Sequence, residues 1–196
     1  MSLAEDISTF LDEKDFSLAI FDLDNTLVNL NLDWIPLKSH LSELNEELYG
    51  KPRDFSRLAA GLEGVRADYG DEGFKPFSDL IAEWEIVAAK ERAVELPDRT
   101  KILKNLKEDG KQTAIFTGNC RESAEITLQR FGLLEFVDLI IGREDVPHQK
   151  PDPSGLLLIL EHFKALASDA IYMGDAEADQ EAGDAAGIRT IIVPKE

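Results

Sequence analysis

Short apolar runs alternate with amphipathic segments from residue 97 to the end of the chain. The apolar runs are about five residues long and scarcely interrupted by polar residues, which is typical of strands buried on both faces of a sheet. The segments between them repeat their apolar residues every three or four positions, which predicts helices with one buried side. The predicted strands are 18–21, 113–117, 137–141, 170–173 and 190–193, and the predicted helices are 98–109, 122–131, 153–163 and 177–186. This order predicts an α/β fold in which helices cover both faces of a parallel sheet.

The stretch between residues 29 and 96 has a different pattern, with helical periodicity and no convincing strand. Its predicted helices are 34–49, 55–62 and 77–94. Gly70, Gly73 and Pro76 indicate a loop before the last of these helices, because both residue types disfavour helical backbone. The pattern therefore predicts that this stretch is a helical insertion.

The chain of 196 residues is long enough to bury a core of its own. We expect a core domain of residues 1–28 and 97–196, with an all-helical cap domain of residues 29–96 inserted after the first strand. A capping box at Ser2–Glu5 predicts one further helix near the N-terminus. No apolar run approaches the roughly 20 residues that cross a bilayer. The N-terminus also lacks the basic and apolar regions of a secretory signal.

Charge and cysteine content narrow the classes of partner. The formal net charge of −18 disfavours binding to nucleic acids and to anionic membranes. It also disfavours an anionic substrate, unless a local cation reverses the sign of the field. The one cysteine, Cys120, cannot form an internal disulfide and suits a reducing cytoplasm, and we expect it to be a small buried residue without a catalytic role. The sequence leaves the oligomeric state open between a monomer and a homodimer.

Two carboxylates, Asp22 and Asp24, follow the first predicted strand directly. Side chains two residues apart on an extended segment point to the same side, so both carboxylates can face one site. Crowded carboxylates repel each other unless a cation or a shared proton lies between them. The pair therefore indicates a cation site or an acid–base pair.

Three later segments carry polar groups beside the predicted carboxyl ends of strands, where parallel sheets bind their ligands. A Thr-Gly-Asn triplet occupies 117–119 at the end of the second strand. Lys150 precedes the helix at 153–163 and is followed by Pro151. Asp175 follows the fourth strand, and Asp179 lies four residues further on, which is the same side of a helix that begins there.

These four motifs, in this order and at these separations, resemble those of the haloacid dehalogenase superfamily, in particular its phosphatases similar to phosphoglycolate phosphatase. The resemblance extends from Phe16 to Pro194. It implies a Rossmann-like α/β core with a small helical cap, and a Mg²⁺-dependent enzyme that removes phosphate from a small phosphorylated metabolite. Dehalogenases that resemble the founding member have no acid at the position of Asp24, because a halide leaves without a proton. Asp24 therefore favours phosphoryl chemistry.

The resemblance implies a role for the residues of the first two motifs. Asp22 would be the nucleophile that forms an aspartyl-phosphate. Asp24 would protonate the leaving oxygen and then activate water. Thr117, Gly118 and Asn119 would bind the phosphate through a hydroxyl group and exposed amides, with the glycine allowing close approach of the backbone.

The same resemblance implies a cation site. Lys150 would neutralise the nucleophile and the oxygens of the transferring phosphoryl group. Mg²⁺ would be held by Asp22, by the backbone carbonyl of Asp24 and by Asp175, which are hard oxygen ligands.

Two further residues would support this site. The hydroxyl of Thr26 would fix the loop that carries Asp22 and Asp24. Asp179 would either bind the metal through water or hold Lys150 in place. Relatives often carry Ser where this chain has Ala176. We expect that difference to tune the site without abolishing its activity.

The cap would exclude water and help to select the substrate. Trp34 and Trp84 are expected in the core of the cap. Four basic residues could contact a second anionic group of the substrate or could simply be solvated: Arg53, Arg57, Arg66 and Lys75. Other functions remain open on the same fold, namely a phosphomutase of the beta-phosphoglucomutase type, an inorganic pyrophosphatase, a nucleotidase and a non-catalytic binding protein.

Overall fold

The computed structural model describes residues 16–195, and the helix predicted at Ser2–Glu5 lies outside this range. The chain forms two compact units. Of the described residues, 16–30 and 93–195 form one unit, and Asn31–Arg92 form the other. Among the described helices, none combines the length and the apolar character that a membrane crossing requires.

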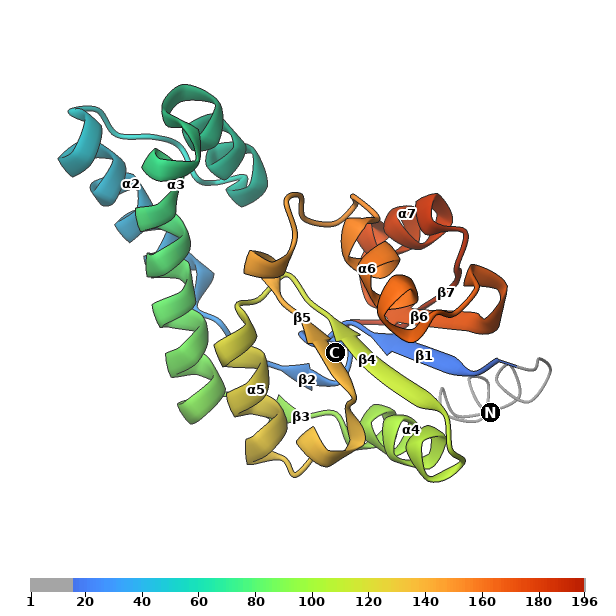
Figure 1. Ribbon diagram of the computed structural model, residues 1–196. Coiled ribbons are helices and arrows are strands. Elements are labelled where there is room, and N and C mark those ends of the chain that lie inside the picture. The colour runs from blue at the N-terminus through green and yellow to red at the C-terminus, as the bar shows by residue number, and fades with distance from the viewer. Residues whose placement is uncertain (1–15, 196) are drawn as a thin grey trace. The chain divides into compact units, whose positions relative to one another are not determined.

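The first unit is built on a five-stranded sheet in which every neighbouring pair of strands is parallel (Figure 1). In spatial order the strands are β5 (Leu139–Ile141), β4 (Gln112–Phe116), β1 (Leu18–Phe21), β6 (Ala170–Gly174) and β7 (Arg189–Ile192). The chain adds β4 and β5 on one side of β1, and β6 and β7 on the other, so the strand order reverses at β1. The α/β fold predicted from the sequence is confirmed, and ligands of such sheets bind at the carboxyl ends of the strands beside such a reversal.

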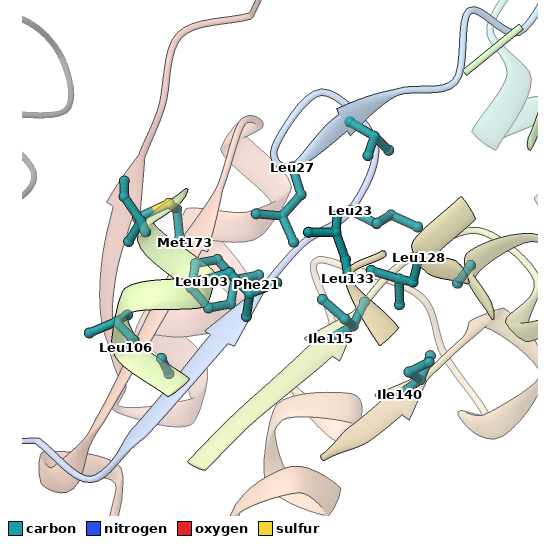
Figure 2. Packing of buried hydrophobic residues seen from close by; sticks show 14 of the residues in the cluster. Phe21, Leu23, Leu27, Leu103, Leu106, Ile115, Leu128, Leu133, Ile140 and Met173 are labelled. Carbon is teal, nitrogen blue, oxygen red and sulfur yellow. The ribbon is translucent and has the colours of Figure 1, made fainter. Parts of the chain in front are cut away.

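Helices cover both faces of this sheet, and they are α4 (Pro97–Glu108), α5 (Arg121–Arg130), α6 (Ser154–Phe163) and α7 (Glu177–Ala186). Successive side chains of β1 point to opposite faces. Phe21 joins the buried cluster formed with α4 and α5, in which Leu103 and Leu128 are also found (Figure 2). Ile20 joins the cluster formed with α6 and α7. Burial on both faces explains why these strands are apolar throughout.

Two strands of two residues each, β2 (Val28–Asn29) and β3 (Val94–Glu95), pair in antiparallel fashion. The sequence predicted no strand between residues 29 and 96, and this was wrong. Strands of this length are too short to display the alternation of apolar and polar residues by which strands are recognised. The described part of this unit also contains 3₁₀ helices at Leu134–Phe136, Arg143–Asp145 and Ala167–Asp169.

The second unit contains the helices α2 (Trp34–Tyr49) and α3 (Leu58–Glu91). The bounds of α2 agree with the prediction. The loop predicted at Gly70–Pro76 is wrong, because α3 is interrupted only at Gly70, with φ 70° and ψ −173°, and continues through Pro76. The separately predicted helices therefore belong to one long, kinked element.

Contacts with α2 account for this difference. The ring of Tyr49 stacks on Tyr69 with a centroid distance of 3.5 Å. The Tyr49 hydroxyl donates a hydrogen bond of 2.9 Å to the carbonyl of Gly73. Phe77, one residue beyond the proline, is fully buried. Packing of this kind overrides the weak helix propensity of glycine and proline.

Candidate active site

The register of the sheet places the predicted motifs at one edge. Phe21, the last residue of β1, pairs with Ile115 of β4 and with Met173 of β6. The amide of Asp22 still donates to the carbonyl of Met173 at 2.8 Å. The loops that follow these three strands therefore leave the sheet at nearly the same level, as the carboxyl ends of neighbouring parallel strands must.

The ammonium group of Lys150 connects these loops. Its Nζ donates to Asp22 Oδ1 at 2.6 Å and to Asp179 Oδ1 at 2.7 Å. The carbonyl oxygen of Phe116, at the end of β4, lies 3.4 Å from Nζ, and the hydroxyl oxygen of Tyr172 lies 3.2 Å from it. The Lys150 side chain is only 12% exposed, so these charges interact largely out of water, where their attraction is strong.

Asp179 is held from both of its oxygens. Oδ1 accepts from the Tyr172 hydroxyl at 2.5 Å as well as from Lys150. Oδ2 accepts from the backbone amides of Asp175 at 3.2 Å and Ala176 at 3.0 Å, at the start of α7. Of the two roles that the sequence left open for Asp179, these hydrogen bonds favour the one in which it holds Lys150 in place.

Gly174 allows Asp179 to take this position. A Cβ atom on Gly174 would lie 2.4 Å from Asp179 Cγ, which is far closer than atoms approach in proteins. The last residue of β6 must therefore be glycine if the carboxylate is to sit beneath it. This is a close-packing requirement, since the backbone conformation of Gly174 is accessible to any residue.

Tyr172 belongs to the site although the sequence gave it no role. It lies in β6, and its side chain is fully buried. Burial, together with the carboxylates of Asp22 and Asp179, raises the pKa of Tyr172 well above 10, so the hydroxyl stays protonated and can donate to Asp179. The only signal in the sequence was a polar-tipped aromatic within an otherwise apolar strand, and such a residue is usually part of a core.

The loop after β1 is built around Asp22. The hydroxyl of Thr26 donates to Asp22 Oδ2 at 3.1 Å, as expected for a residue that fixes this loop. Asn25 has a φ of 59°, and its amide donates to the carbonyl of Val28 at 2.6 Å, which turns the chain sharply. Asp24 Oδ1 accepts from a backbone amide at 2.8 Å and is not among the carboxylates that gather beside Lys150.

The triplet after β4 forms a compact turn. The Thr117 hydroxyl donates to Asn119 Oδ1 at 2.9 Å and accepts from the Asn119 amide at 3.2 Å. The carbonyl of Gly118 accepts from the Arg143 guanidinium at 3.0 Å. Cys120 is buried, as expected, and begins α5 by accepting a hydrogen bond through Sγ. The triplet reaches the rest of the site through Phe116, whose carbonyl contacts Lys150.

Carboxylates outnumber cations in the interior of this site. Burial raises the pKa of Asp22 from 3.8 to about 7; Lys150 opposes this effect, and the charges of Asp179 and Asp175 add to it. Burial also disfavours the charged form of Lys150, but the carboxylates of Asp22 and Asp179 hold its pKa well above 10.5. In return, Lys150 holds the pKa of Asp179 below 3.8 in spite of burial.

The surplus of carboxylates fits a divalent cation. Asp22, Asp175 and Asp179 each bring a carboxylate oxygen, and these oxygens lie within 4.8 Å of one another. Hard oxygen donors of this kind are the ligands that Mg²⁺ prefers. Each oxygen of Asp179 already accepts two hydrogen bonds, whereas each oxygen of Asp22 accepts one. Asp175 makes an ion pair of 3.2 Å with Lys195, which is 66% exposed. Such exposed pairs are weak, so Asp22 and Asp175 are the better candidates for direct ligands.

The basic residues suggested for substrate binding mostly have partners within their own unit. Three of the four make ion pairs there, Arg53 with Asp68, Arg66 with Asp71 and Lys75 with Asp79. The fourth, Arg57, is exposed. Trp34 is also 41% exposed, so its expected place in the core of this unit is only partly realised.

Comparison with known proteins decides the family. Residues 19–193 match the profile of the family described as haloacid dehalogenase-like hydrolase. The chain belongs to the haloacid dehalogenase-like hydrolase family. The solved structure of a putative haloacid dehalogenase-like hydrolase from Bacteroides fragilis superposes on this hydrolase with a TM-score of 0.69 and 24% identity, covering 90% of this chain and 86% of that one.

Relatives of this hydrolase include two kinds of named enzyme. A putative pyrophosphatase PpaX of Caldanaerobacter subterraneus subsp. tengcongensis is 28% identical over 186 residues, covering 89% of this chain and 80% of that protein. A phosphoglycolate phosphatase of Aquifex aeolicus is 30% identical over 180 residues, covering 88% of this chain and 82% of that protein. The similarity therefore extends over most of both chains.

We predict that the metal-free hydrolase loses stability as the pH rises from about 4 to about 7. The pKa of Asp22 is about 7 in the folded chain and about 3.9 in an unfolded one. Across this range the folded chain holds a proton that the unfolded chain has released, so the free energy of unfolding falls with increasing pH. Urea unfolding in EDTA at about pH 5 and about pH 7.5 measures the slope.

The matched variant is Asp22→Asn, which has no proton to release at this position. Its free energy of unfolding should fall less between the two pH values than that of the wild type, because the charged neighbours of Asp22 keep their charge in this range: the pKa of Lys150 is held well above 10.5 and that of Asp179 below 3.8. Equal slopes for the two proteins would contradict the raised pKa of Asp22.

Proposed function

We propose that this hydrolase is a Mg²⁺-dependent phosphatase that cleaves a small phosphomonoester, similar to phosphoglycolate, through an aspartyl-phosphate on Asp22. The observation that carries the proposal is the 2.6 Å contact between Asp22 and Lys150, at the edge of the sheet where the motif loops meet. A buried carboxylate beside an ammonium group, with a second acid two residues further on, suits phosphoryl transfer to a carboxylate. The family to which the chain belongs and its relatives named as phosphatases support phosphatase activity.

The reaction would proceed in two steps. An oxygen of Asp22 attacks the phosphorus, and the bond between the phosphorus and the leaving oxygen breaks while Asp24 gives its proton to that oxygen. Water then attacks the phosphorus of the aspartyl-phosphate, and Asp24 takes a proton from the water. Inorganic phosphate leaves, and both carboxyl groups return to their starting states.

The residues around Asp22 would stabilise the transferring group. The Lys150 ammonium, held by Asp179, lies against the oxygen of Asp22 and would remain close to the phosphoryl oxygens. Mg²⁺ bound by Asp22, Asp175 and the backbone carbonyl of Asp24 would supply further positive charge at the same place.

The triplet after β4 would bind the phosphate. Thr117 would offer its hydroxyl and Asn119 its amide group, both from a turn that already connects to Lys150 through the end of β4. Gly118 would leave room for the phosphate beside the backbone, because among the described residues other than its chain neighbours the nearest atom to the position of a Cβ there is Gln149 Oε1, at 3.7 Å.

The inserted unit of residues 31–92 would serve as the cap that restricts the enzyme to small phosphorylated metabolites. An anionic chain with a single cysteine suits a cytoplasmic enzyme that binds neither nucleic acid nor membrane. The local cations of the site would overcome the repulsion between a chain of net charge −18 and an anionic substrate.

A second candidate function is the hydrolysis of inorganic pyrophosphate. It is favoured by the relatives named as pyrophosphatase PpaX, which are 28–30% identical to this chain. The chemistry at Asp22 would be unchanged, and the leaving group would be a phosphate in place of an alkoxide. The two candidates therefore differ in what the enzyme binds beyond the transferring phosphorus.

The first test is the variant Asp22→Asn. Because the amide cannot attack phosphorus, we expect kcat for p-nitrophenyl phosphate in Mg²⁺ to fall by about 1,000-fold or more, with the thermal unfolding temperature retained. Asp109→Asn is the matched control and should keep full activity, because Asp109 is exposed and precedes the amino end of β4, opposite to the carboxyl end that carries Thr117. EDTA should silence the wild type, and Mg²⁺ should restore it.

Undiminished turnover by Asp22→Asn would refute the assignment of the nucleophile. Undiminished activity in EDTA would refute the role of the metal separately, because the two assays measure different groups of the site.

A second test separates the two candidate substrates. Phosphate release from phosphoglycolate and from inorganic pyrophosphate is measured at equal concentrations with the same enzyme. We expect kcat/KM for phosphoglycolate to be higher, and the opposite order would make the chain a pyrophosphatase. Asp22→Asn should be inactive on both substrates in either case.

A further inference from the structure

Arg99 is a fully buried cation in the first turn of α4. Its Nη1 atom donates to the carbonyl of Asn25 at 2.5 Å and lies 3.4 Å from the carbonyl of Thr26. Its Nη2 atom donates to the carbonyl of Pro194 at 2.5 Å. One planar guanidinium therefore joins three points of the chain that are 73 to 95 residues away in sequence.

The first two of these points belong to the loop that carries the proposed nucleophile. Asn25 has the left-handed backbone that turns this loop, and the hydroxyl of Thr26 donates to Asp22. The chain just before Arg99 holds the same loop, since the amide of Leu96 donates to the carbonyl of Leu27 at 3.0 Å. One side chain of α4 therefore contacts the carbonyl oxygens of two successive residues in this loop, Asn25 and Thr26.

The third point belongs to the segment after β7. The amide of Val193 donates to the carbonyl of Gly174 at 2.8 Å. Gly174 directly precedes Asp175, the second proposed metal ligand, and Pro194 directly follows Val193. Arg99 thus contacts both the loop that carries Asp22 and, at Pro194, the segment whose neighbouring residue is hydrogen-bonded to Gly174, the residue before Asp175.

We infer that Arg99 is a positioning residue that sets the orientation of Asp22 toward the phosphorus and toward Asp175. The inference rests on the proposed phosphatase function. Phosphoryl transfer requires the nucleophile and the leaving oxygen to be roughly in line, and a displacement of about 1 Å can cost about 100-fold in rate. Arg99 touches neither substrate nor metal in this account and acts through the loop.

A role in filling space alone would not require an arginine here. Removing a guanidinium from water is costly, and the hydrogen bonds to three carbonyls offset that cost, because an apolar side chain would leave these acceptors without this donor. What an apolar side chain cannot do is fix two separate loops through a rigid fork of donors. Lysine cannot do so either, because its single ammonium offers no planar pair of donors.

The experiment compares Arg99→Met, Arg99→Lys and Leu106→Ala with the wild type, in Mg²⁺ and with p-nitrophenyl phosphate as the substrate. Leu106 is a buried residue that lies two turns beyond Arg99 in α4. Figure 2 shows it apart from Leu23 and Leu27, which belong to the loop after β1. Its truncation should lower the thermal unfolding temperature and leave the first loop intact, which makes it the control for lost stability.

We expect kcat to fall by about 10- to 100-fold in Arg99→Met, with KM within about threefold of the wild type. Arg99→Lys should be intermediate, and Leu106→Ala should keep both constants within about twofold at temperatures where it is folded. If Arg99→Met does not fold, kcat of Arg99→Lys is compared with that of Leu106→Ala in its place. A kcat for the Arg99 variants within about twofold of that for Leu106→Ala would overturn the inference.

Hydrogen exchange gives a readout that does not depend on activity. The amides of Thr26, Leu27 and Val28 donate to the carbonyl of Leu23, and they should exchange faster in the Arg99 variants relative to amides of β4. Unchanged relative protection would also overturn the inference. If the wild type is inactive but the exchange pattern is as expected, the proposed phosphatase function is refuted. The effect of Arg99 on the loop after β1 is then still supported.

Discussion

The site depends on how one buried ammonium group is held between carboxylates. Lys150 bridges Asp22 and Asp179 at 2.6 and 2.7 Å, and Asp179 is fixed in turn by the hydroxyl of Tyr172 and by two amides at the start of α7. The carboxylates of Asp22, Asp179 and the nearby Asp175 still outnumber the single ammonium group. Burial, together with this surplus of negative charge, raises the pKa of Asp22 to about 7. A bound divalent cation would remove that surplus and leave Asp22 ionised, as a nucleophile must be.

The sheet makes this arrangement possible. The central strand β1 lies between β4 and β6 (Figure 1). Asp22 directly follows β1 and therefore emerges between the loops that follow β4 and β6. The strands are largely apolar on both faces and are covered by helices, so most polar groups of the site lie where the strands end. A rigid core with chemically active loops at one edge is the usual way in which parallel sheets bind ligands.

The sequence predicted the sheet and the gathering of Asp22, Lys150 and Asp175 because these features have strong local signals, namely apolar runs and ordered motifs. It missed Tyr172 and Arg99, since nothing local distinguishes a core tyrosine or a helical arginine from one that serves a site. The uninterrupted course of α3 through Pro76 was missed for a related reason. Contacts with α2 stabilise α3 through Pro76, and such contacts cannot be predicted from the pattern of residues within α3 alone.

A crystal structure of the protein grown with Mg²⁺ and beryllofluoride, which imitates a phosphoryl group on a carboxylate, would show whether Asp22 accepts the phosphoryl group beside Lys150. We expect beryllium bonded to an oxygen of Asp22, a fluorine within hydrogen-bonding distance of Lys150 Nζ, and Mg²⁺ in contact with Asp175. Beryllofluoride bound at another residue, or a Lys150 side chain turned away from it, would show that Asp22 is not the phosphoryl acceptor described above.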